Sequence, residues 1–216
     1  MMGKKADWEL DLEEILPEYE SRNFFVRSLF WKRLKIAENM LLSRKKRSSN
    51  INIVDIGTGP AILQRSISGK YPRALVCGID YNFSIKQIKD RGALNLMIGD
   101  ARSLPFTDSS FDAIFLLDVL EHIPNLKPVL EEIDRVLRPG GLVIISVPTE
   151  TGIYKIGRLL LKGTTDEKDR PGGTHYHNAK RIVGLMKTKF VLRELRKIPL
   201  PLPFTLFNIA CFSKKK

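Results

Sequence analysis

Long apolar runs, cysteines and histidines are all scarce in this sequence of 216 residues. No window of eighteen or more consecutive apolar residues occurs, so we expect no membrane-spanning helix. The N-terminus MMGKKADWEL lacks the apolar stretch that a secretory signal peptide needs. The two cysteines, Cys77 and Cys211, are too few for a disulfide framework and do not stand at metal-ligand spacing. The composition fits a reducing compartment, and we expect a cytoplasmic protein.

Basic residues are concentrated in the two flanks of the chain, whose formal net charge is +12. Residues 22–47 carry nine basic and one acidic side chain, and residues 152–216 carry fifteen and four. The middle segment, residues 48–151, is almost neutral, with ten and twelve. The flanks either attract an anionic partner, which is a nucleic acid, an anionic lipid or a charged small substrate, or form an ordinary solvated surface. Both interpretations stay open at this point.

Short apolar runs alternate with helical patterns from residue 51 onward. The predicted strands are 51–56, 74–79, 94–98, 111–117, 142–147, 190–197 and 205–213. The predicted helices are 22–42, 61–68, 84–91, 126–137 and 178–187. This alternation is typical of a parallel sheet that helices cover on both faces, which indicates a doubly wound α/β fold. We expect a helical cap or lid over residues 1–47 and the main domain over residues 48–216, with residues 152–177 as an insertion on the substrate side.

A glycine-containing loop joins the first predicted strand of that domain to the helix after it. Gly57, Thr58 and Gly59 lie between the two elements. Glycines permit a tight turn and close approach of a ligand to the backbone, and the helix N-terminus offers free N–H groups. A dinucleotide fingerprint requires a third glycine where Ile62 stands. The loop therefore predicts a ligand other than a nicotinamide or flavin dinucleotide.

Three acidic residues, Asp55, Asp80 and Asp100, end three successive predicted strands. A carboxylate at the end of the second strand can accept hydrogen bonds from both hydroxyls of a ribose. Asp100 can accept from an exocyclic amine of adenine, while the Ala101 N–H donates to a ring nitrogen. Each aspartate alone is equally typical of a turn or a helix cap. Their repetition at one edge of the sheet favours a nucleoside-binding site.

Further motifs follow in a fixed order: Asp100–Phe106, Ser110–Ile114, Asp118–Ile123 and Leu137–Leu142. Together with the glycine loop, they resemble the class I S-adenosylmethionine-dependent methyltransferases, in the branch that acts on small molecules, lipids and quinones. The resemblance covers residues 51–148. It implies a mostly parallel seven-stranded sheet with an antiparallel last strand. It also implies S-adenosylmethionine as cofactor, S-adenosylhomocysteine as product, and a small-molecule or lipid-like methyl acceptor.

The resemblance also assigns nine residues to the cofactor. They are Asp55, Gly57, Thr58 and Gly59 beside its methionine part, Asp80 at the ribose, Tyr81, Asp100 and Ala101 at the adenine, and Asp118 at the methionine amino group or the acceptor.

The three histidines are the candidate catalytic residues, since a general base is needed only where the acceptor is poorly ionised. His122 follows the fourth strand near the expected methyl group, or it packs over the cofactor. His175 and His177 flank Tyr176 after a charged loop, which indicates either the substrate pocket or a solvated loop. The pair is also half of a metal site, but the sequence identifies no third ligand, so we expect no metal.

Three other functions compete with methylation of a small acceptor. The basic flanks are compatible with an RNA or protein methyltransferase. A cofactor-binding domain that acts only as an assembly partner fits the same motifs. A nicotinamide-dependent enzyme is disfavoured by Ile62 and by the Gly99–Asp100 pair. The oligomeric state and the identity of the acceptor do not follow from the sequence.

Overall fold

Seven strands form a single sheet in the order β3-β2-β1-β4-β5-β7-β6. The structure, a computed structural model, describes residues 23–81, 94–149, 174–199 and 205–215. The strands are β1 (Asn52–Ile56), β2 (Leu75–Asp80), β3 (Asn95–Ile98), β4 (Phe111–Leu117), β5 (Leu137–Pro148), β6 (Phe190–Pro199) and β7 (Thr205–Lys214). Strands β1 to β5 pair in parallel, whereas β7 runs antiparallel to both β5 and β6. The predicted fold class, with its antiparallel last strand, is confirmed.

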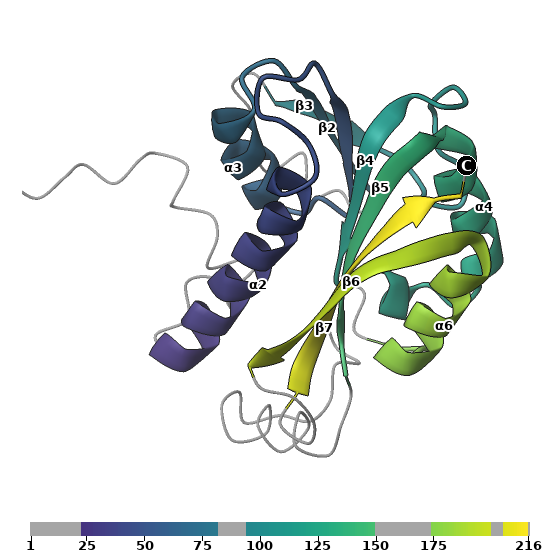
Figure 1. The fold of residues 1–216 in the computed structure, drawn as a ribbon. Helices are drawn as coiled ribbons and strands as arrows, with labels where there is room; N and C mark the ends of the chain where they lie inside the picture. Colours follow the sequence, from purple (N-terminus) through teal and green to yellow (C-terminus); the bar gives the residue numbers. More distant parts are fainter. Residues whose placement is uncertain (1–22, 82–93, 150–173, 200–204, 216) are drawn as a thin grey trace, which may run out of the picture.

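Helices cover both faces of the sheet (Figure 1). One face carries α2 (Phe24–Leu42) and α3 (Ile62–Lys70), and the other carries α4 (Leu126–Val136) and α6 (Ala179–Lys189). Two apolar cores result, one on each side of the sheet. Residues 113–116 of β4 are fully buried, because a central parallel strand packs against a helical layer on each side. The apolar run in the sequence of β4 is continuous because both faces of this strand are buried.

Three of these helices begin with an asparagine that caps the free N–H groups of the first turn. Asn23 accepts from the amides of residues 25 and 26, Asn125 from that of residue 127, and Asn178 from that of residue 181. Helix α3 differs, because Ala61 precedes it in a left-handed conformation (φ 61°) and no side chain caps it. The first N–H groups of α3 are therefore not satisfied by a capping side chain.

The predicted boundaries lie close to the observed ones, apart from the start of β5. The turn expected at 138–141 lies inside β5, because Leu137 already pairs with Phe111 and the ladder resumes, after a register shift, between Leu142 and Ala113. Gly140, at a φ of 71°, sits in that irregular stretch. The predicted helix 84–91, the N-terminal residues 1–22 and residues 152–173 of the expected insertion lie outside the described residues. Within the described ranges, no helix has the length and apolar character needed to cross a membrane.

Candidate cofactor and acceptor site

The polar residues singled out in the sequence gather at the carboxyl ends of β1, β2 and β4. Strands β1 and β4 are parallel neighbours at the centre of the sheet. The chain leaves β1 for α3 on one face and leaves β4 for α4 on the other. The connections diverge at this point, and a doubly wound sheet binds ligands in the crevice that such divergence opens.

The glycine loop after β1 is held against the end of β2. The amide of Gly57 donates to the carbonyl oxygen of Ile79 at 2.7 Å, and the amide of Gly59 donates to Oδ2 of Asp80 at 2.8 Å. Gly57 has a φ of 74°, and a Cβ at this position would overlap the side chain of Val119. The loop thus needs glycine both for its conformation and for its close packing. Asp80 orders the loop in addition to its predicted role at a ribose.

Asp55 is buried beneath this loop, with 3% of its surface exposed. Its Oδ2 atom accepts a hydrogen bond from Oγ1 of Thr58 at 2.9 Å. Burial raises the pKa of Asp55 to about 7; the Thr58 hydrogen bond opposes this rise, and the charge of Asp80 adds to it. The carboxyl group therefore exchanges a proton near neutral pH in the absence of a ligand.

Asp100 forms a turn with Arg102 just after β3. Its Oδ1 accepts from the Arg102 amide at 2.8 Å, and its Oδ2 accepts from the guanidinium at 2.6 Å. The hydrogen bonds from Arg102 hold the pKa of Asp100 below its usual value. The next residue, Ala101, is buried, whereas Tyr81 is exposed. Asp100 thus has the hydrogen bonds of an aspartate in a turn. Its contact with adenine stays a prediction.

Asp118, directly after β4, has a partner that the sequence analysis missed. Its Oδ2 is paired with Arg33 of α2, and its Oδ1 accepts a hydrogen bond from the hydroxyl of Ser146 on β5. Arg33 is 4% exposed, and its guanidinium lies 4.7 Å from the centre of the Phe30 ring. One signal was available, because an arginine beside Leu34 falls on the inward-facing stripe of the predicted helix. A cation buried there requires a partner.

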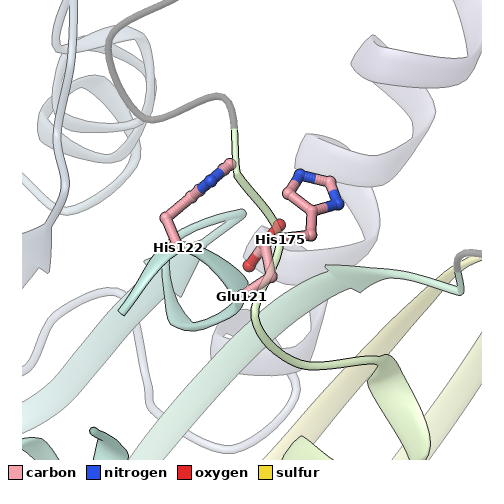
Figure 2. Close-up of side chains that lie close together, drawn as sticks. All are labelled: Glu121, His122 and His175. Atoms are coloured by element: carbon pink, nitrogen blue, oxygen red, sulfur yellow. The ribbon is translucent and has the colours of Figure 1, made fainter. Parts of the chain in front are cut away.

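The structure brings two of the three histidines together and separates the third. His122 ends the short 3-10 helix η3 (Leu120–His122), and its ring lies 4.7 Å from that of His175, centre to centre. The carboxylate of Glu121 lies beside them (Figure 2). His177 is 7% exposed instead, and its Nε2–H donates to the carbonyl oxygen of Pro124 at 3.0 Å. Through this hydrogen bond His177 holds residues 174–177 against the turn that follows η3.

A family model of methyltransferase domains matches the central part of the chain, which contains most of the candidate site. Residues 54–145, from β1 into β5, match the model of a methyltransferase domain. This segment therefore resembles a methyltransferase domain, in agreement with the motifs noted in the sequence. S-adenosylmethionine is the cofactor of this type of domain.

Curated relatives of the methyltransferase domain are enzymes of quinone and sterol metabolism. A demethylmenaquinone methyltransferase of Listeria welshimeri is 31% identical over 140 residues, which are 60% of this chain and 57% of that protein. A sterol 4-C-methyltransferase of Caenorhabditis elegans is 29% identical over 157 residues, which are 66% of this chain and 46% of that protein. The chain spans about half the length of these curated relatives.

Solved structures share the fold over most of the chain. A protein from Pyrococcus horikoshii OT3 has a TM-score of 0.66 and 19% identity, and the match covers 95% of this chain and 99% of that one. The [4+2]-cyclase SpnF has a TM-score of 0.61 and 15% identity, with 84% and 80% covered. At these identities the likeness concerns the fold alone. A cyclase among the neighbours shows that the reaction must be argued from the site.

Proposed function

We propose that this chain transfers the methyl group of S-adenosylmethionine to a small-molecule or lipid-like acceptor. The observation that carries the proposal is the placement of Asp55 and Asp80 at the glycine loop before the uncapped N-terminus of α3, with Asp118 after the neighbouring strand β4. These groups match the charges of the cofactor, which has an ammonium group, a carboxylate and two ribose hydroxyls. The site therefore offers a complementary partner to each polar part of that molecule.

Each end of the cofactor has a group of this chain to receive it. The N–H groups at the start of α3 suit the methionine carboxylate, because helix N-termini attract anions. Asp55 and Asp118 suit the ammonium group. Asp80 already lies at the glycine loop, and one carboxylate accepts several hydrogen bonds, so a ribose can join the Gly59 amide there. Asp100 and the Ala101 amide are the candidates for adenine.

The protein's part in the reaction is alignment of the acceptor. The cofactor supplies an activated methyl group, and fixed orientation of two reactants lowers a barrier by roughly 7–11 kcal/mol in favourable cases. We assign His122 and His175 to the acceptor side, because His122 lies four residues beyond Asp118 at the end of β4 and the His175 ring lies beside it. His177 positions this segment through its hydrogen bond to the Pro124 carbonyl group.

The acceptor class rests on the relatives. Their names include a quinone methyltransferase, two sterol methyltransferases and a malonyl-[acyl-carrier protein] O-methyltransferase, all of which act on small or lipid-like groups. The basic flanks support a different acceptor, RNA or protein, or a contact with an anionic membrane. Label transfer decides between these acceptors.

The test uses cofactor that carries a labelled methyl group, incubated with the chain and a cell extract. The extract is then separated into lipid, small-molecule, RNA and protein fractions. We expect label in the lipid or small-molecule fraction with the unaltered chain and with Asp108→Ala, whose side chain is 78% exposed. Asp80→Ala should lower the label in that fraction when the cofactor concentration is limiting, because we expect it to weaken cofactor binding.

Label in RNA or protein would overturn the acceptor class. Cofactor binding measured separately, without label in any fraction, would favour the role of a binding partner.

A further inference from the structure

Three side chains with metal-binding atoms converge beyond the carboxyl end of β4. Glu121, His122 and His175 each place one ligand atom within 4.8 Å of those of the other two (Figure 2). Glu121 is 1% exposed, and the two histidines are half-buried. The sequence offered only the pair His175 and His177; the fold replaces His177 with a neighbour from η3 and adds a carboxylate. The third ligand that the sequence did not identify is therefore present.

Backbone contacts fix the two segments that carry these side chains. The amide of Tyr176 donates to the carbonyl oxygen of Glu121 at 2.8 Å. Nδ1 of His122 lies 3.4 Å from the carbonyl oxygen of Thr174, to which it can only donate. The Nε2–H of His177 donates to the Pro124 carbonyl oxygen on the other side. Residues 174–177 are thus tied to η3 and the turn after it by three hydrogen bonds.

The contact from His122 has a further consequence. A ring that donates from Nδ1 keeps its lone pair on Nε2, which is the form that binds a metal ion. Histidine ligands commonly donate their second ring nitrogen to a backbone carbonyl group, which fixes the tautomer and the ring plane. Thr174 supplies that carbonyl group here. The site thus contains an outer hydrogen bond as well as candidate ligands.

We propose that Glu121, His122 and His175 bind a divalent transition-metal ion. Two imidazoles and one carboxylate form a mixed nitrogen and oxygen set that suits Zn²⁺, Mn²⁺ or Fe²⁺. With bonds of about 2.0–2.1 Å, tetrahedral ligand atoms lie roughly 3.3 Å apart, so the three groups need to close by no more than about 1.5 Å. Rotation about the χ angles of half-buried His175 can bring its ligand atom closer while the Thr174 contact holds the His122 ring.

Three protein ligands leave at least one coordination position open. The cluster begins three residues after Asp118, and it contains both histidines that the proposed function assigns to the acceptor side. We infer that the open position binds an oxygen of the acceptor, a step that rests on the proposed function. The bound hydroxyl group loses its proton to water, its oxygen attacks the methyl carbon, and the electron pair of the broken carbon–sulfur bond stays on sulfur. The metal ion lowers the pKa of the hydroxyl group and takes no part in electron transfer.

The test of the site is metal binding by the full chain, with neither cofactor nor acceptor present. The chain is freed of metal with a chelator, dialysed, and titrated with Zn²⁺ by calorimetry and with Co²⁺ by visible absorption. We expect one equivalent to bind, with the Co²⁺ bands of a nitrogen and oxygen site. His175→Gln and Glu121→Gln should weaken binding at least about 10-fold, since loss of an outer-shell partner alone costs 10–100-fold.

Glu131→Gln is the matched control, because it makes the same change at an exposed position of α4. Circular dichroism confirms folding of each variant; if Glu121→Gln fails to fold, His175→Gln decides alone. Absence of binding, or equal binding by His175→Gln and the control, would overturn the metal site.

Methyl transfer is then assayed with and without the bound ion. Metal binding without any effect on transfer would leave the site standing and overturn its role at the acceptor. Loss of methyl transfer in all conditions would contradict the proposed function, while the titration still reports on the site.

Discussion

The sharpest prediction concerns the buried carboxyl group of Asp55. Its pKa rises from 3.8 to about 7, first because burial removes the carboxylate from water. The folded state therefore holds a proton that the unfolded chain releases between these two values. A raised acid pKa contributes stability that is complete below pH 3.8 and is lost as the pH rises to about 7. The free energy of unfolding should fall over this interval.

The size of the effect follows from the two pKa values. Each unit of difference corresponds to about 1.4 kcal/mol, so the ionised buried form costs roughly 4 kcal/mol above pH 7, of which about 3 kcal/mol appears between pH 5 and pH 8. Asp55→Asn removes the titration and keeps an oxygen that can accept from the Thr58 hydroxyl group. Urea unfolding of both proteins at pH 5 and pH 8, without cofactor, measures the difference.

The quantity compared is the change in the free energy of unfolding between pH 5 and pH 8, so that the contributions of other titrating groups cancel between the two proteins. The unaltered chain should lose about 3 kcal/mol more than Asp55→Asn from pH 5 to pH 8. Asp108→Asn, the same substitution at an exposed carboxylate, should behave like the unaltered chain. If Asp55→Asn shows the same pH dependence as the unaltered chain, Asp55 is ionised throughout and the argument from burial fails.

Three further predictions concern the residues around Asp55. Gly57→Ala places a side chain at a positive φ and against Val119. We expect urea unfolding to show a free energy of unfolding lowered by about 2 kcal/mol or more. Unchanged stability would mean that the loop repacks freely. Asp80→Ala removes the acceptor of the Gly59 amide, and calorimetry should give a cofactor Kd raised at least about 10-fold; near-native affinity would remove Asp80 from the ribose site. Arg33→Met leaves a carboxylate without its cation, and thermal unfolding should reveal a loss of roughly 2 kcal/mol; an unaltered Tm would show that the pair contributes nothing.

Most of the fold could be predicted because its strands carry a local signal. Strand β4 was predicted over residues 111–117 and is observed over Phe111–Leu117, since both of its faces are buried and the apolar run ends where burial ends. The start of β5 was missed for the opposite reason. The Arg138–Gly141 segment has the composition of a turn, and only pairing of Leu137 with Phe111 on the neighbouring strand extends the ladder through it.

The candidate site was predicted only where its residues follow strand ends. Asp55, Asp80 and Asp118 could be placed because parallel strands finish at one edge of the sheet. Asp118 meets Arg33 because α2 packs against β5 and β7. The spacing of residues in the sequence does not specify where a helix packs on the sheet. The meeting of His122 with His175 has the same origin, since 52 residues separate them along the chain.

The position of Arg33 has a consequence for anyone who divides this chain into modules. The segment recognisable as a methyltransferase domain covers residues 54–145. Residues of the candidate site lie both before and after this segment. Helix α2, which lies before it, contributes the cation at Asp118 and also the apolar layer over one face of the sheet. His175 and the paired strands β6 and β7 come after it. A fragment trimmed to the recognisable segment would lose the cation at its own aspartate, one ring of the histidine pair and two strands of its sheet. The smallest working unit is therefore larger than the segment by which its family is recognised.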